Sequence, residues 1–185
     1  MTQLRRDACR YTKQYCEENV YLLAEQLRQQ QPLAEIHAVF ISNPQRKIPL
    51  WRQQAAREQD LDYHVVLLVR ETVSDDCIVY DLDTTLDFPC SFRTFAIEAL
   101  RADIDLSPDY RRYGLCDSFD SLSFRMANGG KTSDGLGWIA PPPSYAPIRP
   151  ELCNLQKYID MEQHMVDNVY GDVLSETQFL QQFLL

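Results

Sequence analysis

The chain has 185 residues, 45% of them hydrophobic, and a formal net charge of −9. This length and apolar content predict one compact domain that spans residues 1–185. The negative charge opposes the phosphate backbone of nucleic acids, and no basic run is longer than a pair of arginines, so we expect no nucleic-acid partner.

The sequence gives no sign of a membrane segment or an export signal. No apolar stretch approaches the roughly 20 residues that span a bilayer, and the first residues lack the apolar segment of a signal peptide. We therefore expect an intracellular protein without a membrane partner, whose six cysteines are mostly free thiols. No two cysteines form a C-x-x-C pair and the three histidines are far apart, so we expect no metal site and no cofactor.

An amphipathic helix is predicted from about Cys16 to Gln30. Its apolar residues recur with helical spacing: Val20, Leu23, Ala24 and Leu27. Glu17 and Glu18 fall in its first turn, where the helix dipole favours carboxylates. Cys16 should therefore lie at the N-terminus of this helix.

Strands are predicted for the part of the chain that follows. The apolar runs 36–42 and 47–53 are separated by a turn signal that contains Asn43-Pro44, and they are expected to pair. Residues 62–70 and 77–83 form the clearest hairpin, and both arms are apolar on both faces, as in strands covered on two sides.

The second half of the chain is expected to contain helices and one long loop. Residues 91–100 have helical spacing, and Ser107-Pro108 should begin an irregular helical region. Glycines and a triple proline predict loop over 128–150. The capping-box spacing of Ser175–Gln178 predicts a last helix that docks on the core. The order of elements indicates an α+β fold with a mainly antiparallel sheet flanked by helices.

Cys16 is the first candidate for chemistry. A helix N-terminus can lower the pKa of a thiol and make it a better nucleophile, and the predicted helix places Cys16 at such a position. The alternative is that Cys16 is only a small buried residue at the start of a helix, because free cysteine is among the most buried residue types.

His64 lies inside an apolar strand, where an imidazole needs a hydrogen-bond partner. A hairpin register centred between Thr72 and Val73 would place it directly opposite Asp81, with Cβ atoms about 4.5–5.5 Å apart. Asp81 could then orient the ring, as the third member of a catalytic triad does. Because the register is not fixed by the sequence, Asp83 and Asp62 remain alternatives, and His64 could also be a satisfied core residue.

A series of short stretches, spread over most of the chain, carries a family resemblance. They are Asp7-Ala8-Cys9, Tyr15-Cys16-Glu17-Glu18-Asn19, Ala38-Val39-Phe40-Ile41-Ser42-Asn43, Asp62-Tyr63-His64-Val65-Val66-Leu67-Leu68, Tyr80-Asp81-Leu82-Asp83-Thr84, Phe88-Pro89-Cys90 and Pro141-Pro142-Pro143. Together they resemble the protein N-terminal glutamine amidohydrolases. That family has Trp before its Asp-Tyr-His-Val motif, whereas this chain has Leu61, so one apolar contact should differ.

This resemblance implies an enzyme with a papain- or transglutaminase-like cysteine-amidase core. Cys16 would be the nucleophile, His64 the general base and acid, and Asp81 the residue that orients the histidine. The implied reaction deamidates the N-terminal glutamine of proteins and peptides to glutamate, releasing ammonia through a thioester on Cys16. The resemblance also implies a location in the cytoplasm and the nucleus and a role in the N-degron route of protein degradation. We expect the protein to be a monomer.

Selectivity for an N-terminal residue requires that the enzyme bind a free α-amino group. A carboxylate near the pocket mouth would do so, and Glu18, two residues after Cys16, is the candidate. The alternative is that Glu17 and Glu18 only stabilise the first helical turn.

Three other functions, two enzymatic and one non-enzymatic, are compatible with the same residues. A cysteine endopeptidase would cleave internal peptide bonds, and a transglutaminase-like enzyme would transfer the acyl group to an amine. A binding module could also keep the fold while Cys16 stays inert.

Overall fold

A computed structural model describes residues 4–54, 62–70, 76–118, 140–145, 155–161 and 171–184. In these parts the chain forms one sheet with the strand order β4-β3-β2-β1-β5-β6, and every neighbouring pair is antiparallel. The strands are β1 (Glu35–Ser42), β2 (His64–Arg70), β3 (Cys77–Tyr80), β4 (Cys90–Ser91), β5 (Tyr113–Ser118) and β6 (Asp172–Ser175). The predicted α+β class with an antiparallel sheet is confirmed.

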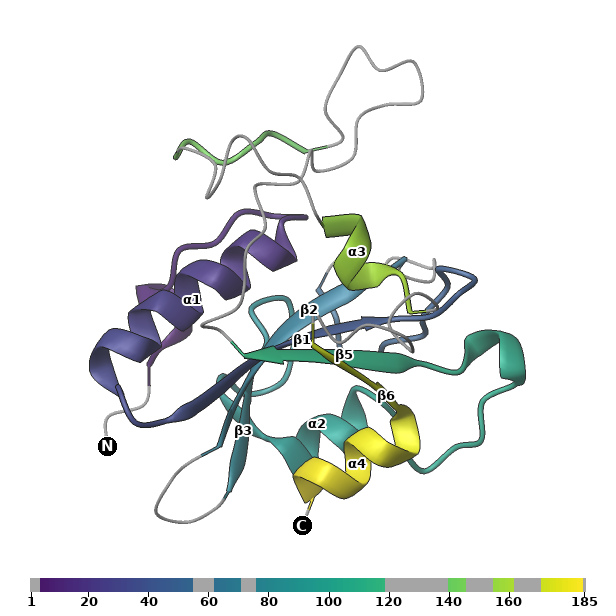
Figure 1. The fold of residues 1–185 in the computed structure, drawn as a ribbon. Helices are drawn as coiled ribbons and strands as arrows, with labels where there is room; N and C mark the ends of the chain where they lie inside the picture. The colour runs from purple at the N-terminus through teal and green to yellow at the C-terminus, as the bar shows by residue number, and fades with distance from the viewer. Residues whose placement is uncertain are drawn as a thin grey trace.

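Helices cover the sheet on both faces. They are α1 (Cys16–Gln30), α2 (Phe92–Glu98), α3 (Leu155–Ile159) and α4 (Glu176–Leu184). Figure 1 shows α1 and α3 on one side of the sheet and α2 and α4 on the other. Along β1, Ala38 and Phe40 pack into the core under α1, whereas Val39 and Ile41 pack into the core over α2 and α4. This alternation explains why the strands are apolar on both faces.

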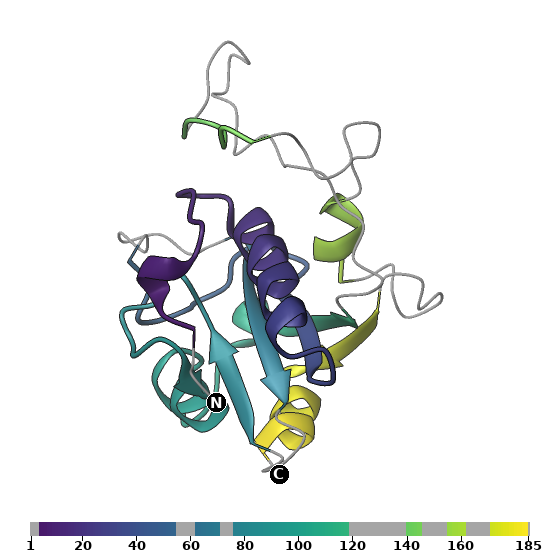
Figure 2. The same cartoon turned by 90° about the vertical axis from the view of Figure 1, so that its left-hand side faces the viewer.

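Helix α1 has the bounds that the sequence predicts. Its four apolar residues with helical spacing are all buried, each at most 2% exposed. They join one core with residues of β1 and β2, and α1 packs most extensively on β2. Figure 2 shows this helix alongside β2. No helix in the described part of the chain has the length and the apolar character that crossing a bilayer requires.

The predicted pairing of 36–42 with 47–53 is wrong. Both edges of β1 are occupied by other strands, because β2 pairs along one edge and β5 along the other. Ile48 and Leu50 bury their side chains in the core over α2 and α4 instead. Gln53, at the end of the segment, makes an isolated β-bridge with Thr84.

The hairpin of β2 and β3 exists, but its register differs from the prediction by two residues. Leu67 lies opposite Tyr80 and Arg70 opposite Cys77, and β3 ends at Tyr80. Asp81 is therefore not directly opposite His64. A shift of two residues keeps each side chain on the same face of the sheet, so the two residues still share a face.

The second half of the chain holds two strands that the sequence does not predict. Ser107-Pro108 begins only a 3-10 turn, Pro108–Tyr110, after which the chain enters β5 instead of a helical region. Residues 140–145 contain no helix or strand, and the rest of the predicted loop 128–150 lies outside the described residues. β6 leads directly into α4.

Two predicted helix starts are confirmed by their hydrogen bonds. Ser91 caps α2 by accepting from the backbone N–H of Thr94. In the predicted capping box, Ser175 Oγ accepts from the backbone N–H of Gln178 at 3.3 Å, and Gln178 Oε1 accepts from the backbone N–H of Ser175 at 2.9 Å. Phe179 and Phe183 of α4 are buried, so the last helix docks on the core as expected.

Candidate active site

His64 and Asp81 form a buried hydrogen-bonded pair. His64 is the first residue of β2, and Asp81 comes directly after β3. Nε2 of the ring lies 3.0 Å from Oδ1 of the carboxylate, and the side chains are 6% and 1% exposed. The contact is diagonal to the strand register, within the reach that side chains on one face of a sheet have. The predicted association of these two residues is confirmed, although by a different geometry.

Both oxygens of Asp81 accept hydrogen bonds. Oδ1 accepts from His64 and from the backbone N–H of Asp83, at 3.0 Å each. Oδ2 accepts from Nε2 of Gln53 at 2.7 Å. The carboxylate is therefore held at both of its oxygens, which fixes the plane that faces the histidine.

The charges of the pair stabilise each other. Burial is the largest single effect and disfavours the imidazolium, but the charge and hydrogen bond of Asp81, together with the charges of Asp83 and Glu17, outweigh it, so the pKa of His64 lies above its usual value. Burial also disfavours the carboxylate, yet the charge and hydrogen bond of His64, followed by the hydrogen bond of Gln53, hold the pKa of Asp81 below its usual value. At neutral pH Asp81 is therefore ionised and can hold the ring through Nε2.

Cys16 is the first residue of α1, as predicted, and its side chain faces the start of β2. The backbone N–H of Val65, the residue after His64, donates to the sulfur. The thiol itself donates to Oε2 of Glu17, with 3.6 Å between Sγ and that oxygen. The nucleophile candidate therefore lies beside the strand end that carries His64.

The pKa of the Cys16 thiol is not lowered, contrary to the expectation from its position on the helix. Burial, followed by the negative charges of Glu17 and Asp83, holds the pKa of Cys16 well above its usual value. The Val65 N–H acts in the opposite direction but does not outweigh these effects. The thiol is thus neutral at rest, and a nearby base must remove its proton before it can attack.

Glu17 and Glu18 are both fully buried in the first turn of α1. Oε2 of Glu17 accepts from the thiol and, at 3.0 Å, from the hydroxyl of Tyr63. Oε1 is buried without a hydrogen-bond partner in the described part of the protein. Burial raises the pKa of Glu17. Burial and then the charge of Glu18 raise the pKa of Tyr145 to about 12, so Glu18 lies near the segment 140–145.

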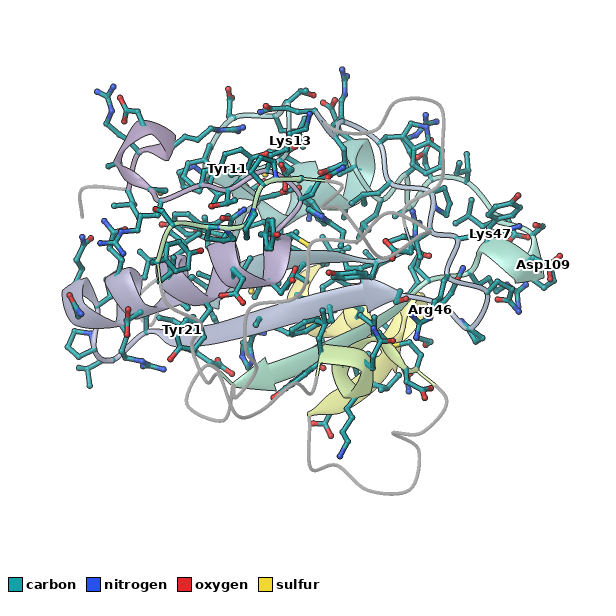
Figure 3. The ribbon with its side chains drawn as sticks, turned by 90° about the horizontal axis from the view of Figure 1, so that it is seen from above. Tyr11, Lys13, Tyr21, Arg46, Lys47 and Asp109 are labelled. Carbon is teal, nitrogen blue, oxygen red and sulfur yellow. The ribbon has the colours of Figure 1, made fainter. Side chains whose placement is uncertain are left out.

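The two alternatives to Asp81 take other roles. Asp62 accepts from the backbone N–H of Tyr63 at 3.0 Å. Asp83 accepts from the hydroxyl of Tyr11, which comes from the segment before α1 (Figure 3). Neither carboxylate makes the hydrogen bond with the His64 ring that Asp81 makes.

One group of donors in the described residues has the spacing of a possible metal site. One ligand atom each of His64, Asp81 and Asp83 lies within 4.8 Å of the others. The ring of His64 and the carboxylate of Asp81 are already hydrogen-bonded to each other, and an ion between them would have to break that bond. The donors therefore fit a catalytic pair better than a metal site.

Sequence reasoning missed Gln53, Tyr63 and Tyr11 as parts of the site. The sequence predicts a strand for Gln53 and does not indicate that its side chain reaches Asp81. Tyr63 precedes His64, and strand alternation gives no sign that it contacts the helix that carries Cys16. Tyr11 belongs to a segment without periodicity, and only the folded chain brings it to Asp83.

The chain is similar in sequence to known proteins over most of its length. The family model described as N-terminal glutamine amidase matches residues 11–183. A protein N-terminal glutamine amidohydrolase of Danio rerio is 40% identical over 95% of this chain and 89% of its own length. Proteins with the same name from Bos taurus and Drosophila melanogaster are 40% and 37% identical, covering 96% and 95% of this chain and 88% of their own lengths.

Proposed function

The chain belongs to the N-terminal glutamine amidase family and is an amidohydrolase, and we propose that it deamidates the N-terminal glutamine of proteins and peptides through a thioester on Cys16. The observation that carries this proposal is the buried His64–Asp81 pair beside the strand end that the Cys16 sulfur contacts. The chain order of Cys, His and Asp is that of papain- and transglutaminase-like enzymes, and we propose that the core is of that type.

In the proposed first step His64 removes the proton of the Cys16 thiol, because the thiol is neutral at rest. The sulfur then attacks the side-chain carbonyl carbon of the substrate glutamine. The tetrahedral intermediate collapses when its C–N bond breaks, and His64 returns the proton to the nitrogen that leaves as ammonia. A thioester remains on Cys16.

In the second step water hydrolyses the thioester. His64 takes a proton from the water, the hydroxide oxygen attacks the thioester carbon, and the C–S bond breaks. The proton passes to the sulfur, which restores the thiol and releases an N-terminal glutamate. Nε2 of His64 is held by Asp81, so Nδ1 is the ring nitrogen that would exchange protons with the thiol, the leaving nitrogen and the water.

Both intermediates place negative charge on the former carbonyl oxygen. The backbone N–H of Cys16 lies at the start of α1, where the first N–H groups have no partner within the helix. We propose that it donates to this oxygen. Loss of one such donor typically costs about 10²–10³ in rate.

A free α-amino group is the feature that distinguishes an N-terminal glutamine from an internal one. We propose that a carboxylate in the first turn of α1 binds this ammonium group, and Glu18 is the residue that the sequence predicts for it. Its burial and its proximity to Tyr145 support a place within the site. The product, an N-terminal glutamate, would feed the N-degron route of protein degradation.

The test is ammonia release from short peptides that begin with Gln, Asn or pyroglutamate. The proposal expects ammonia and an N-terminal Glu from the Gln peptide only, because the shorter Asn side chain leaves its carbonyl out of reach of the sulfur. Cleavage of an internal bond would support an endopeptidase, and incorporation of an added amine would support a transglutaminase. Full activity of Cys16→Ala would rule out Cys16 as the nucleophile.

A further inference from the structure

Gln53 is a buried residue whose side chain bonds directly to the proposed catalytic carboxylate. The residue is 8% exposed, and its Nε2 donates to Oδ2 of Asp81 at 2.7 Å. The other oxygen of Asp81 already accepts from His64 and from the backbone of Asp83. Gln53 is thus the side chain that holds the oxygen of Asp81 facing away from the histidine.

The backbone around Gln53 is hydrogen-bonded to the turn that follows Asp81. Gln53 makes a β-bridge with Thr84, and the backbone N–H of Gln54 donates to the carbonyl of Asp83 at 2.7 Å. The carbonyl of Arg52 accepts from Thr84 Oγ1 at 3.1 Å. Arg52 has a φ of 60°, a left-handed conformation that side-chain-bearing residues rarely adopt, so the chain bends sharply just before Gln53.

The amide of Gln53 has a defined orientation but an incomplete set of bonds. A reversed amide would place Oε1 against a carboxylate oxygen, and two acceptors repel each other, so the N–H must face Asp81. In this orientation Oε1 is buried without a hydrogen-bond partner among the described residues. An unpaired buried acceptor is destabilising. The polar contribution of Gln53 in the described structure is therefore its N–H, which donates to the buried carboxylate of Asp81.

We infer that Gln53 is a positioning residue for the reaction, which fixes the Asp81 carboxylate in the plane that holds the His64 ring. This inference rests on the proposed roles of His64 and Asp81. The hydrogen bond of Gln53 also helps keep Asp81 ionised, because it is one of the contacts that hold the pKa of this carboxyl below its usual value. His64 then keeps Nδ1 for proton transfer.

Two substitutions separate this role from the filling of space. Gln53→Leu removes the donor and keeps the volume, so kcat/KM for a Gln peptide should fall about tenfold or more. Its acid limb should move to higher pH, because Asp81 without this donor attracts the imidazolium proton of His64 more strongly. Gln53→Glu keeps the shape, and while its new carboxyl is protonated it can still donate to Asp81. Its activity should therefore exceed that of Gln53→Leu at low pH and fall as that carboxyl ionises.

Gln54→Leu is the matched control. Gln54 is an exposed neighbour whose side chain donates to the backbone carbonyl of Thr84 at 3.1 Å and does not bond Asp81. This variant should keep the activity and the pH profile of the wild type. If Gln53→Leu and Gln53→Glu also keep the wild-type pH profile, the inference is overturned, whatever their thermal stability.

A measurement without substrate distinguishes failure of this inference from failure of the proposed function. The imidazole of His64 can be titrated by NMR, and the spectrum of His64→Gln identifies its signals. The titration midpoint in Gln53→Leu should move above that of the wild type, because a carboxylate without its donor attracts the imidazolium proton more strongly. An unchanged midpoint would overturn the inference even if the wild type released ammonia. If the midpoint shifted but the wild type released no ammonia, the positioning of Asp81 by Gln53 would be supported and the proposed function would be overturned.

Discussion

The thiol of Cys16 donates a hydrogen bond to the carboxylate of Glu17, with 3.6 Å between Sγ and Oε2. Burial is the largest effect that opposes the formation of a thiolate at Cys16, and the negative charge of Glu17 acts in the same direction. The N-terminus of α1 is therefore not sufficient to activate the nucleophile. The free enzyme should hold a neutral thiol, and the proposed mechanism therefore uses His64 as the base that removes its proton.

The first prediction concerns the pH at which Cys16 reacts with iodoacetamide. Only the thiolate is alkylated rapidly, and the pKa of this thiol is raised, so the rate at neutral pH should be low and should keep rising beyond pH 9. Mass spectrometry of the Cys16 peptide measures this rate. A rate that has already reached its plateau at pH 7 would contradict the neutral resting thiol.

The second prediction concerns Glu17→Gln. This substitution removes the negative charge beside the sulfur, so the pKa of Cys16 should fall and alkylation at neutral pH should become faster than in the wild type. Glu18→Gln is the matched control, because it removes the same charge from the next residue of the helix. It should change the alkylation rate less, and equal effects of the two variants would show that Glu17 has no special relationship with the thiol.

The third prediction concerns the effect of Glu17 on the pH dependence of the free energy of unfolding. The pKa of this carboxyl is raised in the folded state, so over the interval between its unfolded and folded values the folded state binds more protons than the unfolded state. Stability should therefore fall as pH rises through this interval. Glu17→Gln cannot ionise, so in urea unfolding it should gain stability relative to the wild type as pH increases. A constant difference at all pH values would contradict this prediction.

The fourth prediction concerns Asp81→Asn. Burial lowers the pKa of His64, and the charge of Asp81 is the largest of the effects that raise it, so without that charge the pKa should fall. The base must be neutral to accept a proton, so the acid limb of kcat/KM should move to lower pH in the residual activity of this variant. We expect kcat to fall by about 10²–10⁴. An acid limb at the wild-type position would show that Asp81 does not govern the titration.

The fifth prediction concerns the scaffold on the other face of the sheet. Arg112 is 2% exposed, and its guanidinium pairs with Glu176 of α4 and donates to the carbonyls of Pro49 and Leu100. Arg112→Ala leaves these acceptors without their donor and should destabilise the protein by about 3–5 kcal/mol in urea unfolding. Glu98→Gln, which weakens an exposed pair with Arg52, should cost less than about 1 kcal/mol.

The parts of the fold that depend on neighbouring residues could be predicted from the sequence. The apolar spacing of α1 and the capping box at Ser175 are local patterns, and the structure has both at the expected residues. The partners of β1 depend on segments far apart in the chain, and local apolarity gave no reason to prefer β2 and β5 over residues 47–53.

In the candidate site, too, local patterns could be predicted and contacts between distant segments could not. His64 and Asp81 could be associated because the hairpin is short and a two-residue error in register does not change the face. The roles of Gln53 and Glu17 could not be predicted, because each depends on where a buried side chain finds its partner. Burial, followed by the charge of Glu17, raises the pKa of Cys16, whereas the position on the helix alone predicts a lowered pKa.

The strand order has a consequence for the protein during its synthesis. Cys16, Gln53, His64 and Asp81 all come from the first 84 residues, and β1 can pair with β2 soon after both leave the ribosome. The other edge of β1 is covered only when β5, which ends at Ser118, has been made. Until then an apolar central strand presents unpaired N–H and C=O groups, which are a template for aggregation. The proposed catalytic residues thus lie in the first half of the chain, and that half needs β5 from the second half to cover β1 and prevent it from pairing with other chains.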